Sequence, residues 1–159
     1  MDSAAFGDYY ATRYGALVGH VTAMCGDCAE ASDAVQEAFV RAWDRRRQFG
    51  RASDKDAWIR TVARRIIIDD WRKRRRLVRS GVDPIIEQPD TAGRVALHRA
   101  LGELPDNHRH AVVLHYLVDL PVAAIAAELG AKEPTVRVWL SRGRARLEEL
   151  LDEKEDQHA

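Results

Sequence analysis

Apolar residues recur at helical spacing along most of this sequence, and no segment shows the strict alternation of a half-buried strand. The clearest series has the i, i+3, i+4, i+7, i+8 spacing of a buried helical stripe: Val35, Ala38, Phe39, Ala42 and Trp43. A second long stripe covers residues 56–75. Residues 4–24 fit one or two further helices, although three glycines weaken the pattern there. The periodicity therefore predicts an all-α fold.

A short stretch rich in glycine and proline divides this helical pattern. Residues 80–93 contain two glycines and two prolines and have no periodicity, which is typical of a linker. Four shorter helical patterns follow, over residues 95–103, 106–118, 122–129 and 134–151. We therefore expect two small helical domains, residues 1–79 and 94–152, joined by a short flexible linker over residues 80–93 and followed by an acidic tail over residues 153–159.

The net charge of zero conceals two basic segments. The chain has 25 Lys plus Arg and 25 Asp plus Glu, but residues 41–79 hold 15 basic and 5 acidic side chains. Residues 134–146 hold four arginines and no acid, whereas residues 147–159 hold six acids and one lysine. Blocks of like charge repel unless a partner neutralises them, so this distribution favours polyanion contacts at two places. Arginine-rich helix faces that only aid solubility are the alternative.

Several classes of protein are excluded or disfavoured. No apolar run approaches the roughly 18 residues of a spanning helix, and no secretion signal opens the chain. We expect a cytoplasmic protein without membrane insertion. No nucleophile–base set, phosphate-binding glycine loop or third carboxylate near Asp69 and Asp70 is visible. We therefore expect no catalytic residues, no cofactor and no metal, and a nucleic-acid-processing enzyme stays as a disfavoured alternative.

Two cysteines have the spacing of a redox pair or of half a zinc site, Cys25 and Cys28. A zinc site needs four ligands, and only His20 could add a third. A plain loop ahead of the helix that begins near Asp33 is therefore favoured over both functional interpretations.

Residues 122–151 have the layout of a helix-turn-helix: a short helix ending at Gly130, a short turn and a long helix. On a helical wheel, the leucines of the long helix fall with Val136 and Gly143 on a core side. Small residues and one arginine lie opposite, with cations along both edges, which suits a helix in the DNA major groove. The predicted DNA contacts are Thr135, Arg137, Val138, Ser141, Arg142 and Arg144. Arg142 is the candidate for a bidentate guanine contact, and an ordinary surface helix is the alternative.

The helix over residues 58–76 combines cations with two tryptophans. Aromatic faces beside Arg and Lys suit the unstacked bases and phosphates of a single strand. Trp58 and Trp71 could equally pack in the core. Residues 72–76 are five consecutive cations, which cannot all be paired locally, and a phosphate backbone is their natural counterion.

Several stretches, taken together in their order and spacing, resemble the extracytoplasmic-function (ECF) group of bacterial sigma factors in the sigma-70 family. They are DAVQEAFVRAW at residues 33–43, AWIRTVAR at 57–64, ALGELP at 100–105, IAAELG at 125–130, TVR at 135–137 and LSRGRARL at 140–147. The resemblance implies a promoter-specificity subunit of RNA polymerase. Its first domain would dock on the β′ clamp helices and read and melt the minus-ten element. Its second would read the minus-thirty-five element and meet the β flap, and an anti-sigma factor would control both.

The resemblance also implies roles for particular residues. The polymerase contact would be formed by Asp33, Gln36, Glu37, Val40 and Asp44. The minus-ten contact would be formed by Arg51, Ser53, Asp54, Trp58, Arg60, Arg64, Arg65, Arg72 and Arg75. The six helix-turn-helix residues above would read the minus-thirty-five element. Val138 and Trp139 replace a common Ser-Arg pair, so we expect an unusual preference there. A stand-alone duplex-binding regulator is the rival interpretation.

Overall fold

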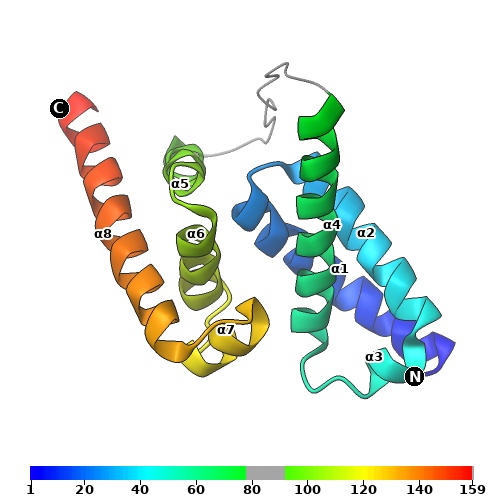
Figure 1. Cartoon of the computed structure of the whole chain (residues 1–159). Helices are drawn as coiled ribbons and strands as arrows, with labels where there is room; N and C mark the ends of the chain where they lie inside the picture. Colours follow the sequence, from blue (N-terminus) through cyan, green and yellow to red (C-terminus); the bar gives the residue numbers. More distant parts are fainter. Residues whose placement is uncertain (78–91, 159) are drawn as a thin grey trace. The chain divides into compact units, whose positions relative to one another are not determined.

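The computed structural model of the chain describes residues 1–77 and 92–158, and none of these residues belongs to a strand (Figure 1). They form two compact helical units, which confirms the predicted all-α fold. Most of the predicted linker lies outside the described residues. No described helix is both long and apolar enough to cross a membrane.

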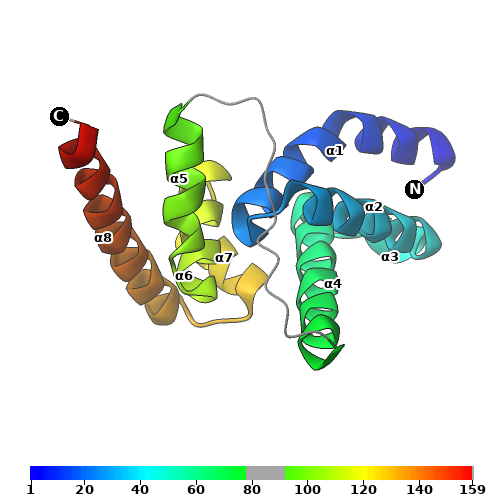
Figure 2. The ribbon, with the colours of Figure 1, turned by 90° about the horizontal axis from the view of Figure 1, so that it is seen from above.

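The first unit consists of α1 (Ser3–Cys25), α2 (Cys28–Asp44), α3 (Arg46–Gly50) and α4 (Lys55–Leu77). The three long helices pack on one another (Figures 1 and 2). Their shared core includes Leu17 of α1, Val35 of α2 and Ile59 of α4, each with no exposed surface. The N-terminal stretch is thus one helix despite its glycines, because its apolar side chains are buried against two other helices.

The two cysteines flank the turn between α1 and α2. Gly26 ends α1 in the left-handed region, at φ 86°, and donates its backbone N–H to the Thr22 carbonyl at 2.7 Å. The Asp27 side chain then caps α2 by accepting a hydrogen bond from the backbone N–H of Glu30 at 3.0 Å. Cys25 and Cys28 are half-buried at the two helix ends and form no disulfide, and Cys25 Sγ donates to the Asp27 carbonyl at 3.5 Å. Among the described residues, no group of three His, Cys, Asp or Glu could hold a metal ion.

The second unit consists of α5 (Ala92–Gly102), α6 (Asp106–Val112), the single π-helical turn η1 (Val113–Leu117), α7 (Val122–Leu129) and α8 (Glu133–His158). Leu114 of η1, Ile125 of α7 and Val136 of α8 are fully buried in it. α8 ends at His158 instead of the expected Leu151, so described residues of the predicted acidic tail are helical. Glutamate is a good helix former, so the helix continues past its last core residue.

Close packing between α6 and α8 depends on a glycine. A Cβ atom at Gly143 would lie 2.7 Å from Cγ2 of Val112 and 3.4 Å from the carbonyl oxygen of His108. A side chain at this position would therefore hold the two helices apart. The glycine lets α8 approach α6 and brings the helix-turn-helix into a compact unit.

Candidate nucleic-acid interface

The helix-turn-helix is formed by α7 and α8. Gly130 ends α7 with φ 66°, a left-handed conformation that glycine adopts without strain, and its N–H bonds the Ala126 carbonyl. Two residues later, the backbone carbonyl of Lys132 accepts a hydrogen bond from the backbone N–H of Val136 at 3.1 Å. This short turn sets the direction of α8, which is then held by the burial of Val136.

One side of α8 faces solvent, as the wheel predicted. Val136, Gly143 and Leu150 are buried, whereas Val138 on the opposite side is 45% exposed. The structure brings the predicted minus-thirty-five residues together on this exposed side: Thr135, Arg137, Val138, Ser141, Arg142 and Arg144. A helix with small residues at its centre and arginines around them can enter a major groove and meet phosphates along its edges.

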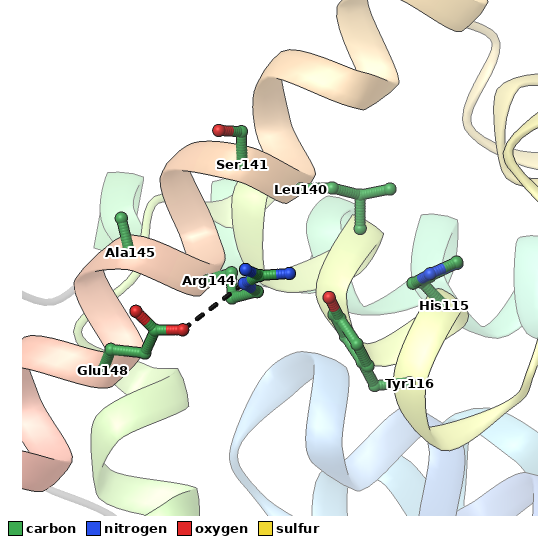
Figure 3. A pocket seen from close by; sticks show the side chains of 7 residues that line it. All are labelled: His115, Tyr116, Leu140, Ser141, Arg144, Ala145 and Glu148. Carbon is green, nitrogen blue, oxygen red and sulfur yellow. Dashed lines mark ion pairs between the residues drawn. The ribbon is translucent and has the colours of Figure 1, made fainter.

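A groove of about 340 Å³ adjoins this exposed side, between η1 and α8 (Figure 3). Its lining is His115, Tyr116, Leu140, Ser141, Arg144, Ala145 and Glu148. Arg144 Nε lies 3.3 Å from Glu148 Oε1, and a hydrogen bond with Tyr116 raises the pKa of the Arg144 guanidinium, with Glu148 adding to the shift. Sequence reasoning missed Tyr116 and Glu148, although the i, i+4 spacing of Arg144 and Glu148 was a signal for their pairing.

The predicted minus-ten residues divide by burial. Arg51, Ser53, Asp54, Arg65 and Arg72 are exposed, and Trp58 and Arg64 are half-buried. The side chain of Arg75 lies outside what the structure describes. Trp71, which the predicted set omitted, is 51% exposed on the same helix as the cations. Arg65, Arg72 and this indole share the basic helix α4.

Arg60 does not fit the predicted minus-ten surface. It is only 1% exposed, because it follows Ile59 on the side of α4 that packs into the core. Its charge acts on Asp56 and His20 within the first unit. We therefore leave it out of the proposed DNA surface.

Two other predicted contacts have structural roles at the start of α4. Asp54 caps the helix by accepting a hydrogen bond from the backbone N–H of Ala57 at 2.9 Å. The Trp58 ring meets the ring of fully buried Phe49 edge-on, with centroids 5.2 Å apart. Trp58 thus packs at the edge of the core, which agrees with the core-packing alternative for this residue.

One cation of the basic run is paired within the unit. Arg74 Nη2 lies 3.1 Å from Glu30 Oε1, which joins the end of α4 to the start of α2. Burial raises the pKa of Glu30, although Arg74 and a hydrogen bond with Trp71 oppose that shift.

A polar network that the sequence did not reveal joins α1 to α4. The Tyr9 hydroxyl donates to Asp56 Oδ1 at 2.6 Å, and Arg13 donates to Asp56 Oδ2 from Nη2 and Nε at 2.7 and 3.1 Å. Burial opposes the charge of Asp56, but the hydrogen bonds from Arg13 and Tyr9 outweigh it and lower the pKa of the carboxyl. Burial and the same bond raise the pKa of Tyr9.

His20 lies close to this network. Its Nδ1 is buried and has no hydrogen-bond partner among the described residues. Burial, together with the nearby charges of Arg60 and Arg13, lowers the pKa of the imidazole. The folded first unit therefore favours a neutral His20.

The predicted polymerase-contact residues form one exposed face of α2: Asp33, Gln36, Glu37, Val40 and Asp44. Val40 is 54% exposed and lies on this face among polar side chains. Glu37 Oε1 accepts a hydrogen bond from Arg41 at 3.3 Å on the same helix. The buried residues of α2 lie on the opposite side, as the periodicity predicted.

A helix-turn-helix unit and a second helical unit with an exposed basic helix define a two-unit DNA-binding protein. Its sequence matches the family profiles of Sigma-70 region 2, over residues 9–77, and of Sigma-70 region 4, over residues 94–147. The ECF RNA polymerase sigma factor SigL of Mycobacterium tuberculosis is 36% identical over 124 residues, which cover 72% of this chain and 70% of SigL. The RNA polymerase sigma-E factor of Streptomyces avermitilis is 31% identical over 157 residues, which cover 94% of this chain and 87% of that sigma factor.

Solved structures agree with these sequence matches. The sigma factor RpoE from Bartonella quintana, in complex with the anti-sigma factor NepR, has a TM-score of 0.80 and 25% identity, covering 93% of this chain and 97% of RpoE. CnrH, in complex with the cytosolic domain of CnrY, has a TM-score of 0.66 and 26% identity, covering 95% and 90%. The chain belongs to the ECF group of sigma factors in the sigma-70 family.

Proposed function

We propose that this sigma factor binds core RNA polymerase and directs it to promoters that carry two elements. The observation that carries the proposal is the presence of two different exposed basic surfaces, one on each unit. α8 offers small residues flanked by arginines, whereas α4 offers cations together with an exposed indole. Duplex DNA suits the first surface and melted DNA the second, so one chain has the side chains to meet both states of a promoter.

In the second unit, α8 reads the minus-thirty-five element. Arg142 lies at the centre of the exposed side, where its planar guanidinium can meet both acceptors of a guanine. Val138 is exposed beside it and can pack on a thymine methyl group. Arg137 and Arg144 lie toward the edge, where phosphates of the groove wall would be met.

In the first unit, the exposed part of α4 and the loop before it read the minus-ten element as it melts. Arg65 and Arg72 provide charge for the backbone, and Arg51 and Ser53 lie on the loop ahead of the helix. Trp71 adds a face on which an unpaired base can stack. Unpaired bases are available only after melting, so this contact favours the open promoter.

Polymerase docks on the exposed face of α2 through its β′ clamp helices, and the β flap meets the second unit. Support for this docking face comes from its position, which matches the polymerase contact of the family, and from its five exposed side chains on one side of α2. The chain contributes no catalytic residue, and it works in the cytoplasm, where polymerase and promoters are. An anti-sigma factor controls it, as the complex of the related RpoE with NepR suggests by analogy.

The test combines the purified chain with sigma-free core polymerase and a genomic DNA library, and sequences the transcripts. We expect discrete start sites that share two upstream elements. A chain with Arg142→Ala is the matched control, because it should keep polymerase binding and lose one preferred base in the upstream element. Specific duplex binding without polymerase binding or initiation would contradict the proposal and favour a stand-alone regulator.

A further inference from the structure

The arginines of α8 fall into two groups. Arg144 is paired with Glu148 at 3.3 Å, and Arg146 is paired with Glu149 at 3.0 Å and lies 3.8 Å from Glu103. Within the described parts of the chain, neither Arg137 nor Arg142 has an ion-pair or hydrogen-bond partner. The wheel separates these arginines by position on the helix, and the structure separates them further by pairing.

Arg144 has an ion-pair partner on its own helix. Glu148 lies one turn further along α8, with its Oε1 3.3 Å from Arg144 Nε, and Tyr116 of η1 lines the same groove (Figure 3). The Glu148 carboxylate offsets the charge of Arg144 at the place where a phosphate would bind.

We propose that Glu148 is an anion that competes in cis with DNA phosphate for Arg144. The inference rests on the proposed use of α8 as the duplex reader. Arg144 must exchange Glu148 for a phosphate, whereas Arg137 and Arg142 need no such exchange. Arg144 therefore adds less to DNA affinity and to its salt dependence than its charge alone would give.

The acidic half of α8 makes this competition a local effect. The helix continues without a break from the arginines into the acids, so the backbone of Glu148 stays one turn from Arg144 when DNA binds. The pair presents less positive charge to the phosphates than an unpaired arginine would. Fewer counterions are then released from the duplex than an unpaired arginine would release.

The test uses the full chain and a labelled mixed-sequence duplex, with affinity measured across a range of NaCl concentrations. Glu148→Gln should tighten binding by about 2- to 5-fold at low salt, the range typical of exposed ion pairs. It should also steepen the plot of log affinity against log salt, by up to about 0.9, the value of one phosphate contact. Glu153→Gln is the matched control, because it makes the same charge change on the same helix more than one turn further away.

A double-variant cycle separates competition from a general change of field. The effect of Glu148→Gln should disappear when Arg144 is already replaced by Gln, because the competed cation is then absent. An equal gain in Glu153→Gln, or a gain that persists in the Arg144→Gln background, would overturn the inference. If the parent chain binds no duplex at all, the proposed duplex reading itself fails, and the inference falls with it.

Discussion

Replacing Gly143 with alanine tests the packing that holds α8 against α6. Alanine is the better helix former, so an uncrowded Gly→Ala change inside a helix stabilises it by about 0.5–1 kcal/mol. Here the added Cβ would lie 2.7 Å from Cγ2 of Val112, a distance that real Cβ contacts essentially never show. Helix propensity and crowding oppose each other, and their relative sizes decide whether Gly143→Ala stabilises or destabilises the second unit.

Crowding should win at this position. Val112 is 5% exposed and cannot swing into solvent, and the His108 carbonyl at 3.4 Å belongs to the backbone. Inserting a methyl group into a packed core costs about 1–3 kcal/mol. The expected net loss is about 1–2 kcal/mol, which for a unit of this size lowers its Tm by roughly 4–16 °C.

Hydrogen exchange of the full chain is the suitable assay, because the two units need not unfold together and exchange follows each one separately. Protection should fall in the second unit and stay unchanged in the first. Gly102→Ala is the control in the same unit, since nothing lies within 4 Å of a Cβ built there. Undiminished protection in Gly143→Ala would refute the close approach of α8 to α6.

Four further predictions concern stability and binding. The pKa of His20 is lowered in the folded chain, so as pH falls below about 6.5 the imidazole takes up a proton more readily in the unfolded chain, and the free energy of unfolding decreases. Urea unfolding at several pH values should show a smaller decrease in stability at low pH for His20→Gln. The pKa of Asp56 is lowered in the folded chain instead, so this carboxylate stabilises the folded chain above about pH 4, and that stabilisation is lost as pH falls further. Asp56→Asn should cost about 1–2 kcal/mol at pH 7 in the same assay, and an unchanged midpoint would contradict the network. Gln36→Ala with Glu37→Ala should weaken binding to core polymerase but leave duplex binding intact, as a pull-down and a duplex titration would show. Arg142→Ala should cost about 1–3 kcal/mol at one base position and relax the preference there; an equal loss on all sequences would place Arg142 on a phosphate.

Local patterns predicted most of the elements correctly. The stripe around Val35 and the wheel around Val136 separate buried from exposed side chains because the helical period is a property of the backbone itself. The residue that ends α7 was likewise visible, since Gly130 adopts a positive φ that other residues avoid. The exposure of the predicted surfaces on α2 and α8 follows from the same period.

Only the tertiary structure decided what the charged residues do. Arg60 and Asp56 look like surface residues in the sequence, yet one is buried and the other is bound by Tyr9 and Arg13 from a helix more than 40 residues away. The groove that Tyr116 and Arg144 share also needs η1 beside α8, whereas the pairing of Arg144 with Glu148 follows the local i, i+4 spacing. The amino-acid sequence by itself determined the helices and their apolar faces, because these depend on neighbours along the chain. Whether cations of α4 such as Arg60 and Arg74 stay available for DNA depends on side chains brought close by folding, and no local pattern contains that information.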